Sequence, residues 1–291
     1  MKQSRIPFAL LFFAQAHTTG LWMVTFSNVL KAHGLERTIP YAFSCSAIAA
    51  FISPLIAGSL ADQHIAPGRL LRWVALGTAL FLALSFTAIE RNWGAMWLLI
   101  FFQIQFLFSM PTWGLATSIV LRVLENPTSE FGPIRVWATF GWIAAGFVNS
   151  YVLRADLSPR AGMAAAGVWV VVAALTYLLP KVEPGAGTTR RTWRELLGLE
   201  ALSLLRHRDH SVVFVTAALV SIPLAAFYPF TSMQLHELGE ERVAVTMSLG
   251  QVTEIIAMYA LAPLLARFRM KWILLAGMAS ACCGVTDGRR S

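Results

Sequence analysis

The sequence is poor in charged residues for its length. Only 13% of its 291 residues are Asp, Glu, Lys or Arg, whereas 57% are hydrophobic. A single water-soluble core cannot bury so much apolar surface, so this composition excludes an ordinary soluble domain. Lipid must therefore cover much of the chain.

Cysteines are also few, and the common hydrolase motifs are missing. Cys45, Cys282 and Cys283 lie in or beside apolar runs, without the spacing of metal ligands or of a disulfide framework. The sequence contains no H-E-x-x-H or G-x-S-x-G motif and no pair of carboxylates within the apolar runs. We expect no metal, no cofactor and no enzyme activity, with a membrane-embedded enzyme as the alternative from another class.

What the sequence does have is apolar blocks of about 20 residues, the length that a helix needs to cross roughly 30 Å of hydrocarbon. The charged residues fall between these blocks. This pattern predicts an all-α fold, a polytopic transmembrane helical bundle. The expected spans are residues 7–30, 40–61, 70–89, 94–121, 136–153, 162–180, 211–234 and 244–265, with a partial ninth that starts near 271.

The net charge of +8 follows this topology and does not form one nucleic-acid-binding face. With the N-terminus in the cytoplasm, fifteen of the 23 Lys and Arg residues fall on the inner side and six on the outer side. This positive-inside bias predicts a multi-pass protein of the cytoplasmic (inner) membrane with a cytoplasmic N-terminus.

One long hydrophilic stretch divides the chain. We expect an N-terminal six-helix bundle at 1–180, a cytoplasmic inter-bundle loop at 181–210 and an incomplete C-terminal transmembrane bundle at 211–291. About 15 apolar residues follow 271, too few for a comfortable crossing, which predicts a truncated or frameshifted second half. Two parallel bundles joined by a long loop are typical of transporters.

One carboxylate lies well inside an apolar run. Glu254 is flanked by Val252, Ile255 and Ile256. A charge there costs at least a few kcal/mol, so an unpaired Glu254 would tend to take up a proton. Gln251 lies one turn earlier on the same helical face. The pair predicts a polar site that exchanges a proton with water; the alternative is a structural carboxylate that holds helices together.

A second polar face is expected on the fifth span. Arg135, Thr139 and Trp142 are four and three residues apart and share one side of a helix. A cation, a hydroxyl and an aromatic ring suit a polar solute that carries a ring, although Arg135 could instead extend to the lipid headgroups. Tyr228, beside Pro229, suggests an interrupted seventh span that lines a cavity, with packing against neighbouring helices as the alternative.

Two resemblances add to this interpretation. Residues 58–62 (GSLAD), with Arg69 seven residues after the Asp, resemble the signature of the major facilitator superfamily. The resemblance implies a major facilitator type of bundle in which Gly58, Asp62 and Arg69 govern gating. The alternative is an ordinary polar loop.

A more specific resemblance is to the nucleoside:proton symporter family of that superfamily. The stretches that carry it are 110–115 (MPTWGL), 131–142 (FGPIRVWATFGW), 193–201 (WRELLGLEA) and 248–254 (SLGQVTE). The resemblance implies substrate binding by Arg135, Thr139, Trp142, Gln251 and Glu254. Span seven departs from the family pattern, because Ala225 and Tyr228 occupy positions where polar amides are usual.

The function expected from these observations is proton-coupled uptake of nucleosides by alternating access. Substrate-binding candidates are Arg135, Thr139, Trp142, Tyr228, Gln251 and Glu254, and Glu254 is also the candidate for proton coupling. The expected partners are a small solute, protons and membrane lipid, with no nucleic acid and a monomeric chain. The alternatives are a major facilitator carrier of a sugar or an aromatic acid, and an inactive fragment of such a carrier.

Overall fold

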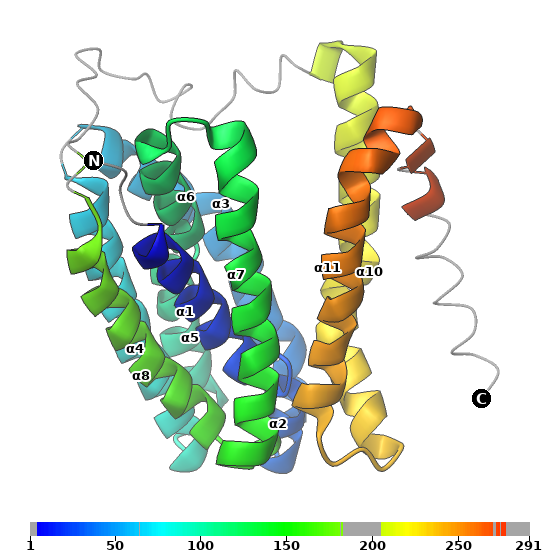
Figure 1. Ribbon diagram of the computed structural model, residues 1–291. Helices are drawn as coiled ribbons and strands as arrows, with labels where there is room; N and C mark the ends of the chain where they lie inside the picture. The colour runs from blue at the N-terminus through cyan, green and yellow to red at the C-terminus, as the bar shows by residue number, and fades with distance from the viewer. Residues whose placement is uncertain are drawn as a thin grey trace.

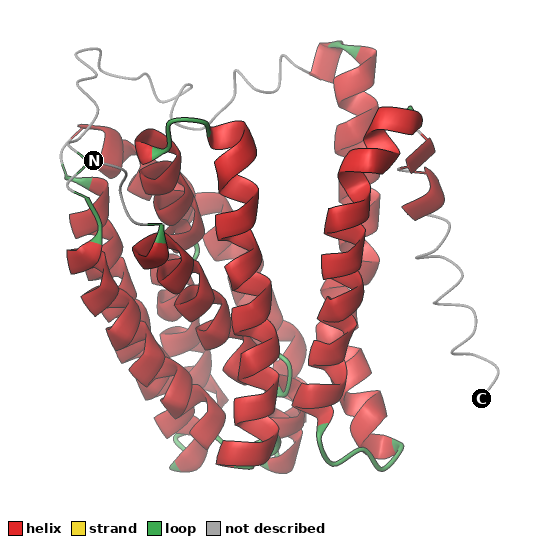
Figure 2. Ribbon diagram, in the orientation of Figure 1, coloured by secondary structure: helices red, strands yellow, loops and turns green. Residues whose placement is uncertain are grey.

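The computed structural model describes residues 5–63, 65–180, 182, 205–269, 272–273 and 275–277, and its regular structure there is helical throughout (Figure 2). Six helical stretches are long and apolar enough to cross a membrane. The predicted all-α transmembrane bundle is confirmed (Figure 1). The helices are α1 (Ile6–Trp22), α2 (Phe26–Ala32), η1 (Glu36–Thr38), α3 (Ile39–Gln63), α4 (Pro67–Glu90), α5 (Ala95–Ser109), α6 (Pro111–Val123), α7 (Pro127–Phe147), η2 (Val148–Leu153), α8 (Arg160–Leu175), η3 (Thr176–Leu178), α10 (Arg208–Glu237) and α11 (Val243–Arg267).

The helices cover the eight expected full spans, and their ends lie within three residues of the expected ones except at the fifth span, where α7 begins at Pro127 and not near 136. The first span is divided into α1 and α2 by a short turn, and the fourth is divided into α5 and α6 just before Pro111. Of the expected ninth span, only 272–273 and 275–277 are described, and these residues are helical. The expected inter-bundle loop lies mostly outside the described residues, and α10 already begins at Arg208.

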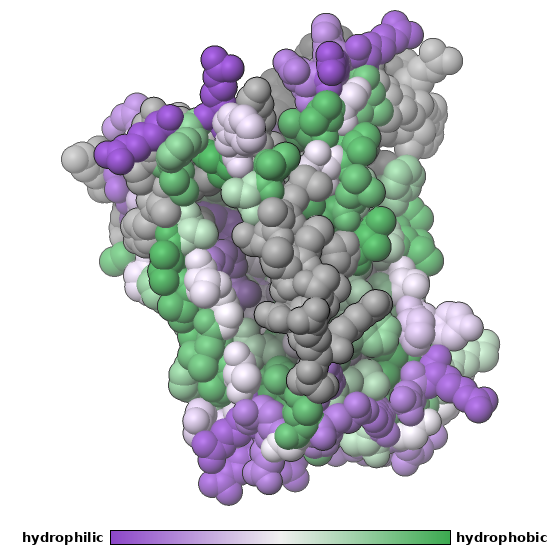
Figure 3. Space-filling view, turned by 90° about the vertical axis from the view of Figure 1, so that its right-hand side faces the viewer, coloured by the Kyte–Doolittle hydropathy of each residue, from purple (hydrophilic) through white to green (hydrophobic). Residues whose placement is uncertain are grey.

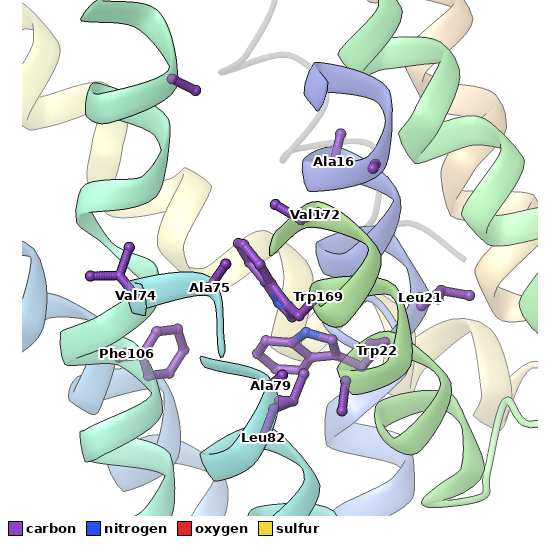
Figure 4. Packing of buried hydrophobic residues seen from close by; sticks show 14 of the residues in the cluster. Ala16, Leu21, Trp22, Val74, Ala75, Ala79, Leu82, Phe106, Trp169 and Val172 are labelled. Atoms are coloured by element: carbon purple, nitrogen blue, oxygen red, sulfur yellow. The ribbon is translucent and has the colours of Figure 1, made fainter. Parts of the chain in front are cut away.

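Aromatic side chains form much of the interior of the first bundle. Trp22 of α1 lies 5.2 Å from Phe102 of α5 between ring centroids, and Phe26 of α2 stacks on Phe102 at 4.7 Å. Trp169 of α8 and Leu82 of α4 lie beside Trp22 in the same cluster (Figure 4). Large rings thus fill the space between four helices, and aromatic pairs of this kind contribute about 0.5 to 1.5 kcal/mol beyond their buried area.

The surface is apolar between two polar ends. On the face that carries α10 and α11, hydrophilic residues gather at both ends of the molecule and hydrophobic residues lie between them (Figure 3). We name the ends by their residues. The Asp156 end holds 33–38, 91–94, 154–159 and 238–242, and the Arg69 end holds 65–69, 124–126 and 268–269. An apolar band between polar ends is the arrangement that a bilayer requires.

The pair α10 and α11 meets the first bundle at the Asp156 end. The Asn28 side-chain amide donates to the Ser232 carbonyl at 3.0 Å, and Lys31 forms an ion pair with Glu237 at 2.7 Å. Among the described side chains of α11, the buried ones lie within 243–248, whereas those of α10 from 212 to 227 are mostly exposed. The two groups of helices are therefore in contact at one end and separate toward the Arg69 end (Figure 1).

Two glycines let α7 approach its neighbours closely. A Cβ added at Gly141 would overlap the backbone carbonyl of Phe13 in α1. A Cβ added at Gly146 would lie 2.7 Å from the Ala244 carbonyl oxygen of α11. Because backbone atoms stand in the way, a side chain at either position would push a whole helix aside.

We expect Gly141→Ala to lower the free energy of unfolding by about 1 to 3 kcal/mol, because overpacking against backbone forces α1 and α7 apart. The matched control is Gly167→Ala in α8, where the added Cβ would meet no described atom within 4 Å. Thermal unfolding of the detergent-solubilised protein measures both. Equal melting temperatures for the two variants would show that the α1–α7 contact does not require a glycine.

Candidate binding site

Helix α7 carries the predicted polar face. Thr139 is buried, and Arg135 and Trp142 are half-buried. The helix is held on its α1 side by a contact of 3.0 Å between the ring nitrogen Nδ1 of His17 and the carbonyl oxygen of Gly141. This contact anchors α7 between Thr139 and Trp142, so it sets the height of both residues in the bundle.

The Arg135 guanidinium lies among aromatic rings. Its central carbon is 4.6 Å from the ring centroid of Trp113 in α6 and 5.7 Å from that of Phe12 in α1. The two rings lie 5.9 Å apart and support each other. A cation over ring faces is attracted by their electron density, and the attraction grows as water is excluded. The rings of Trp113 and Phe12 thus hold the Arg135 guanidinium against α6 and α1.

A cavity adjoins Arg135. It has a volume of about 620 Å³ and is lined by Trp113, Gly114, Thr117, Ser118, Leu121, Arg122 and Arg135. Sequence reasoning assigned Arg135 to the site but gave Trp113 no role. The available signal was the position of Trp113 within the stretch 110–115, one of those that carry the family resemblance.

Glu254 lies near the middle of α11 and is exposed, with Gln251 half-buried one turn before it. The charge of Glu254 acts electrostatically on both Arg135 and Tyr228. The three residues come from α11, α7 and α10, so the structure brings together groups that are far apart in the sequence. Arg135 and Glu254, both described, form no ion pair, which leaves both charges available to a third group.

Trp142 and Tyr228 meet across the two groups of helices, with ring centroids 5.8 Å apart. Both pack against an apolar cluster of Val24, Val243 and Met247, to which Leu235 also contributes. We call these six residues the apolar plug. The plug lies between the Asp156 end and the residues Glu254 and Arg135. Beyond it the two groups of helices separate toward the Arg69 end, and we call this part the open side. The candidate site lies at its base.

The predicted interruption of the seventh span is wrong. Helix α10 runs without a break from Arg208 to Glu237 and passes through Pro229. Pro229 removes one backbone hydrogen bond, and the Ser232 hydroxyl donates to the Pro229 carbonyl at 3.4 Å. Tyr228 therefore faces Trp142 from an intact helix, and packing, the stated alternative, describes its surroundings.

The gating-motif residues lie away from this site, at the Arg69 end. Gly58 is half-buried, and an added Cβ there would meet no described atom within 4 Å. Arg69 is exposed, and the side chain of Asp62 lies outside what the structure describes. In this conformation no described residue of another helix lies close to Gly58.

Comparison with known proteins decides the family. The sequence profile described as "Nucleoside H+ symporter" matches residues 2–284. The chain belongs to the nucleoside H+ symporter family. This confirms the resemblance drawn from the four sequence stretches, and the family consists of transporters.

Several curated relatives of this chain come from Escherichia coli K12. The chain is 30% identical over 279 residues to YegT, whose name assigns it provisionally to nucleoside transport; the match covers 93% of this chain and 64% of YegT. It is 26% identical to the nucleoside permease NupG, over 93% of this chain and 68% of NupG. It is 25% identical to the xanthosine permease, over 92% and 67% of the two chains. The chain thus spans about two thirds of the length of these relatives.

The fold of the chain matches solved structures of NupG. A mutant of NupG superposes with a TM-score of 0.80 at 22% identity, over 91% of this chain and 68% of that chain. A second NupG structure superposes with a TM-score of 0.73. The described helices therefore share the fold of NupG, in agreement with the predicted all-α transmembrane bundle.

If the open side is filled with water, a cysteine placed at exposed Glu254 will react with a membrane-impermeant maleimide added on the side that the Arg69 end faces. Cysteine in place of Ser232, which is fully buried, is the unreactive control. Both variants are made after Cys45, Cys282 and Cys283 are replaced by Ser. Failure of Glu254→Cys to react, with the protein folded, would mean that this position faces lipid.

Proposed function

We propose that this chain carries nucleosides together with protons, by alternating access of one site to the two sides of the membrane. Its family and the nucleoside transport named for its relatives support the proposal. The observation that carries it is the contact between Trp142 and Tyr228 across the two groups of helices, with the charge of Glu254 within electrostatic range of Arg135 and Tyr228.

Each of these groups suits part of a nucleoside. The Trp142 and Tyr228 rings offer faces for a nucleobase. Arg135, Thr139 and Gln251 supply hydrogen-bond donors and acceptors for ribose hydroxyls and base edges. Because the rings of Trp113 and Phe12 already hold Arg135, it binds with little loss of side-chain freedom.

We assign proton coupling to Glu254. A carboxylate in an apolar span is costly when charged, and it can exchange a proton with water only while its side is open. A protonated Glu254 donates one hydrogen bond, whereas the carboxylate only accepts, so protonation changes what the site can bind. Solute and proton would thus bind cooperatively at one place.

We propose that the Arg69 end faces the cytoplasm of a cell whose inner membrane holds the protein. Arg5, Arg69, Arg72, Arg122 and Arg208 lie toward this end, in agreement with the positive-inside rule. The structure would then be inward-open. Gly58, Asp62 and Arg69 would act when this end closes, as residues 1–180 and 211–291 move against each other.

The proposed function predicts uptake of radiolabelled uridine or adenosine into proteoliposomes under an inward proton gradient. Glu254→Gln should lower gradient-driven uptake roughly tenfold or more, which corresponds to at least about 1.4 kcal/mol of lost coupling. Asp209→Asn is the matched control, an exposed carboxylate in the first turn of α10. NupG serves as the positive control for reconstitution.

Undiminished gradient-driven uptake by Glu254→Gln would remove Glu254 from the coupling mechanism. Absence of uptake by the folded chain, with NupG active, would contradict the proposed transport by this chain. If an unlabelled sugar or aromatic acid competes with the labelled nucleoside for uptake, the substrate would be reassigned to that class of solute.

A second prediction concerns the rings around Arg135. Trp113→Leu removes the nearer ring, and a partly desolvated cation–π contact contributes roughly 0.5 to 2 kcal/mol. We expect KM for the nucleoside to rise about 2- to 30-fold, while Trp113→Phe keeps most of the affinity. Equal KM values for Trp113→Leu and Trp113→Phe would show that the ring does not position Arg135.

A further inference from the structure

A buried carboxylate joins the two groups of helices at the Asp156 end. Asp156 is only 8% exposed. Its Oδ1 accepts a hydrogen bond of 2.8 Å from the backbone N–H of Ala244, in the first turn of α11. It also accepts a hydrogen bond of 3.1 Å from the hydroxyl of Ser150. The oxygen of that hydroxyl in turn accepts a hydrogen bond of 3.3 Å from the Val245 N–H. Two residues of the first bundle thus satisfy two backbone donors of α11 that have no partner within the helix.

Local backbone structure brings these residues together. The end of α7 widens into the π-helix η2, which ends at Arg154 in the left-handed conformation with φ of 49°. This turn returns the chain so that Asp156 lies beside Ser150. π-Helical segments and left-handed non-glycine residues are uncommon, and they occur frequently at functional sites.

Water reaches Asp156 through a pocket of about 640 Å³. Tyr151 and Arg242 lie across it, with the Arg242 guanidinium 4.6 Å from the Tyr151 ring centroid. The pocket is lined by Ser150, Tyr151, Arg154, Asp156, Leu157, His236, Glu241 and Arg242. The carboxyl group is therefore buried in the junction and still next to a route for protons.

We propose that Asp156 is a second protonation site of this protein, whose neutral form seals the junction between η2 and α11. The inference rests on the proposed alternation between two open states. The proton comes from water in the pocket and forms an O–H bond at Oδ2. The hydrogen bond from Ala244 of α11 and the one from Ser150 both fall on Oδ1, so protonation at Oδ2 removes neither of them.

The direction of the pH effect follows from burial. Asp156 lies outside the membrane-spanning segments, and burial raises its pKa above the ordinary value. The hydrogen bonds from Ala244 and Ser150 act in the opposite direction, and the negative charge of Glu240 raises the pKa further. Opening of the junction returns Asp156 to water and to an ordinary pKa. The closed junction therefore binds the proton more tightly, and by linkage a lower pH favours closure.

Other charged groups near Asp156 also have to be considered. Arg154, His236, Glu241 and Arg242 line the pocket, and the Lys31–Glu237 ion pair lies at the same end. His236 is the histidine among these groups, and histidine is the residue type that most often gives proteins a pH response, so it is the main competitor to Asp156. Its replacement therefore belongs in the test.

The test measures the junction directly and needs no transport. Spin labels replace exposed Val152 on η2 and exposed Leu238 after α10, in the full chain without native cysteines, in lipid nanodiscs. Pulsed electron–electron resonance gives the distance distribution at pH values from 8 to 4. We expect the short-distance population to grow as the pH falls. Asp156→Asn should stay closed at every pH, because Asn keeps an acceptor oxygen and carries no charge.

Three further variants keep the outcome decisive. His236→Gln and Asp209→Asn should retain the pH response, whereas Glu240→Gln should move its midpoint to lower pH. Glu240→Gln also provides the test if Asp156→Asn does not fold. A distance distribution independent of pH in the unsubstituted chain, a response lost in His236→Gln, or a response that persists in Asp156→Asn would overturn the proposal. None of these results depends on whether the chain transports nucleosides.

Discussion

Helix α7 is the element on which the rest of the structure depends, because it is in backbone contact with both groups of helices. Gly141 allows contact with the Phe13 carbonyl on one side, and Gly146 allows contact with Ala244 and Ser248 on the other. With no side chain between them, small shifts of α11 are transmitted to α7 and then to α1. The polar residues of α7 thus have fixed positions relative to both neighbours.

This arrangement explains why the site lies where it does. Contact between α7 and α11 is confined to the Asp156 end, where the apolar plug excludes water. Beyond the plug, the exposed carboxylate of Glu254 can be hydrated, so its charge does not have to be paired. Arg135 is less exposed than Glu254, and the rings of Trp113 and Phe12 take the place of water around its guanidinium. Each charge thus has its own source of stabilisation.

The helices and the polar faces could be predicted from the sequence because they depend on local periodicity. The length of apolar runs located the spans, and spacing placed Arg135, Thr139 and Trp142 on one face. The aromatic surroundings of Arg135 could not be predicted, since they need α1 and α6 to converge on α7. The expected break at Pro229 was wrong because a single missing N–H does not end a helix whose neighbouring turns keep their own bonds.

The importance of Asp156 was hidden for a related reason. It lies in a short polar loop of the sequence, and only the arrival of α11 buries it. On the proposals above, its burial in one state and hydration in the other make it the counterpart of Glu254. A low external pH would neutralise both carboxyl groups while the outer side is open. Neutral Glu254 would admit the solute and neutral Asp156 would allow the junction to close behind it, so one gradient would drive both steps in the same direction.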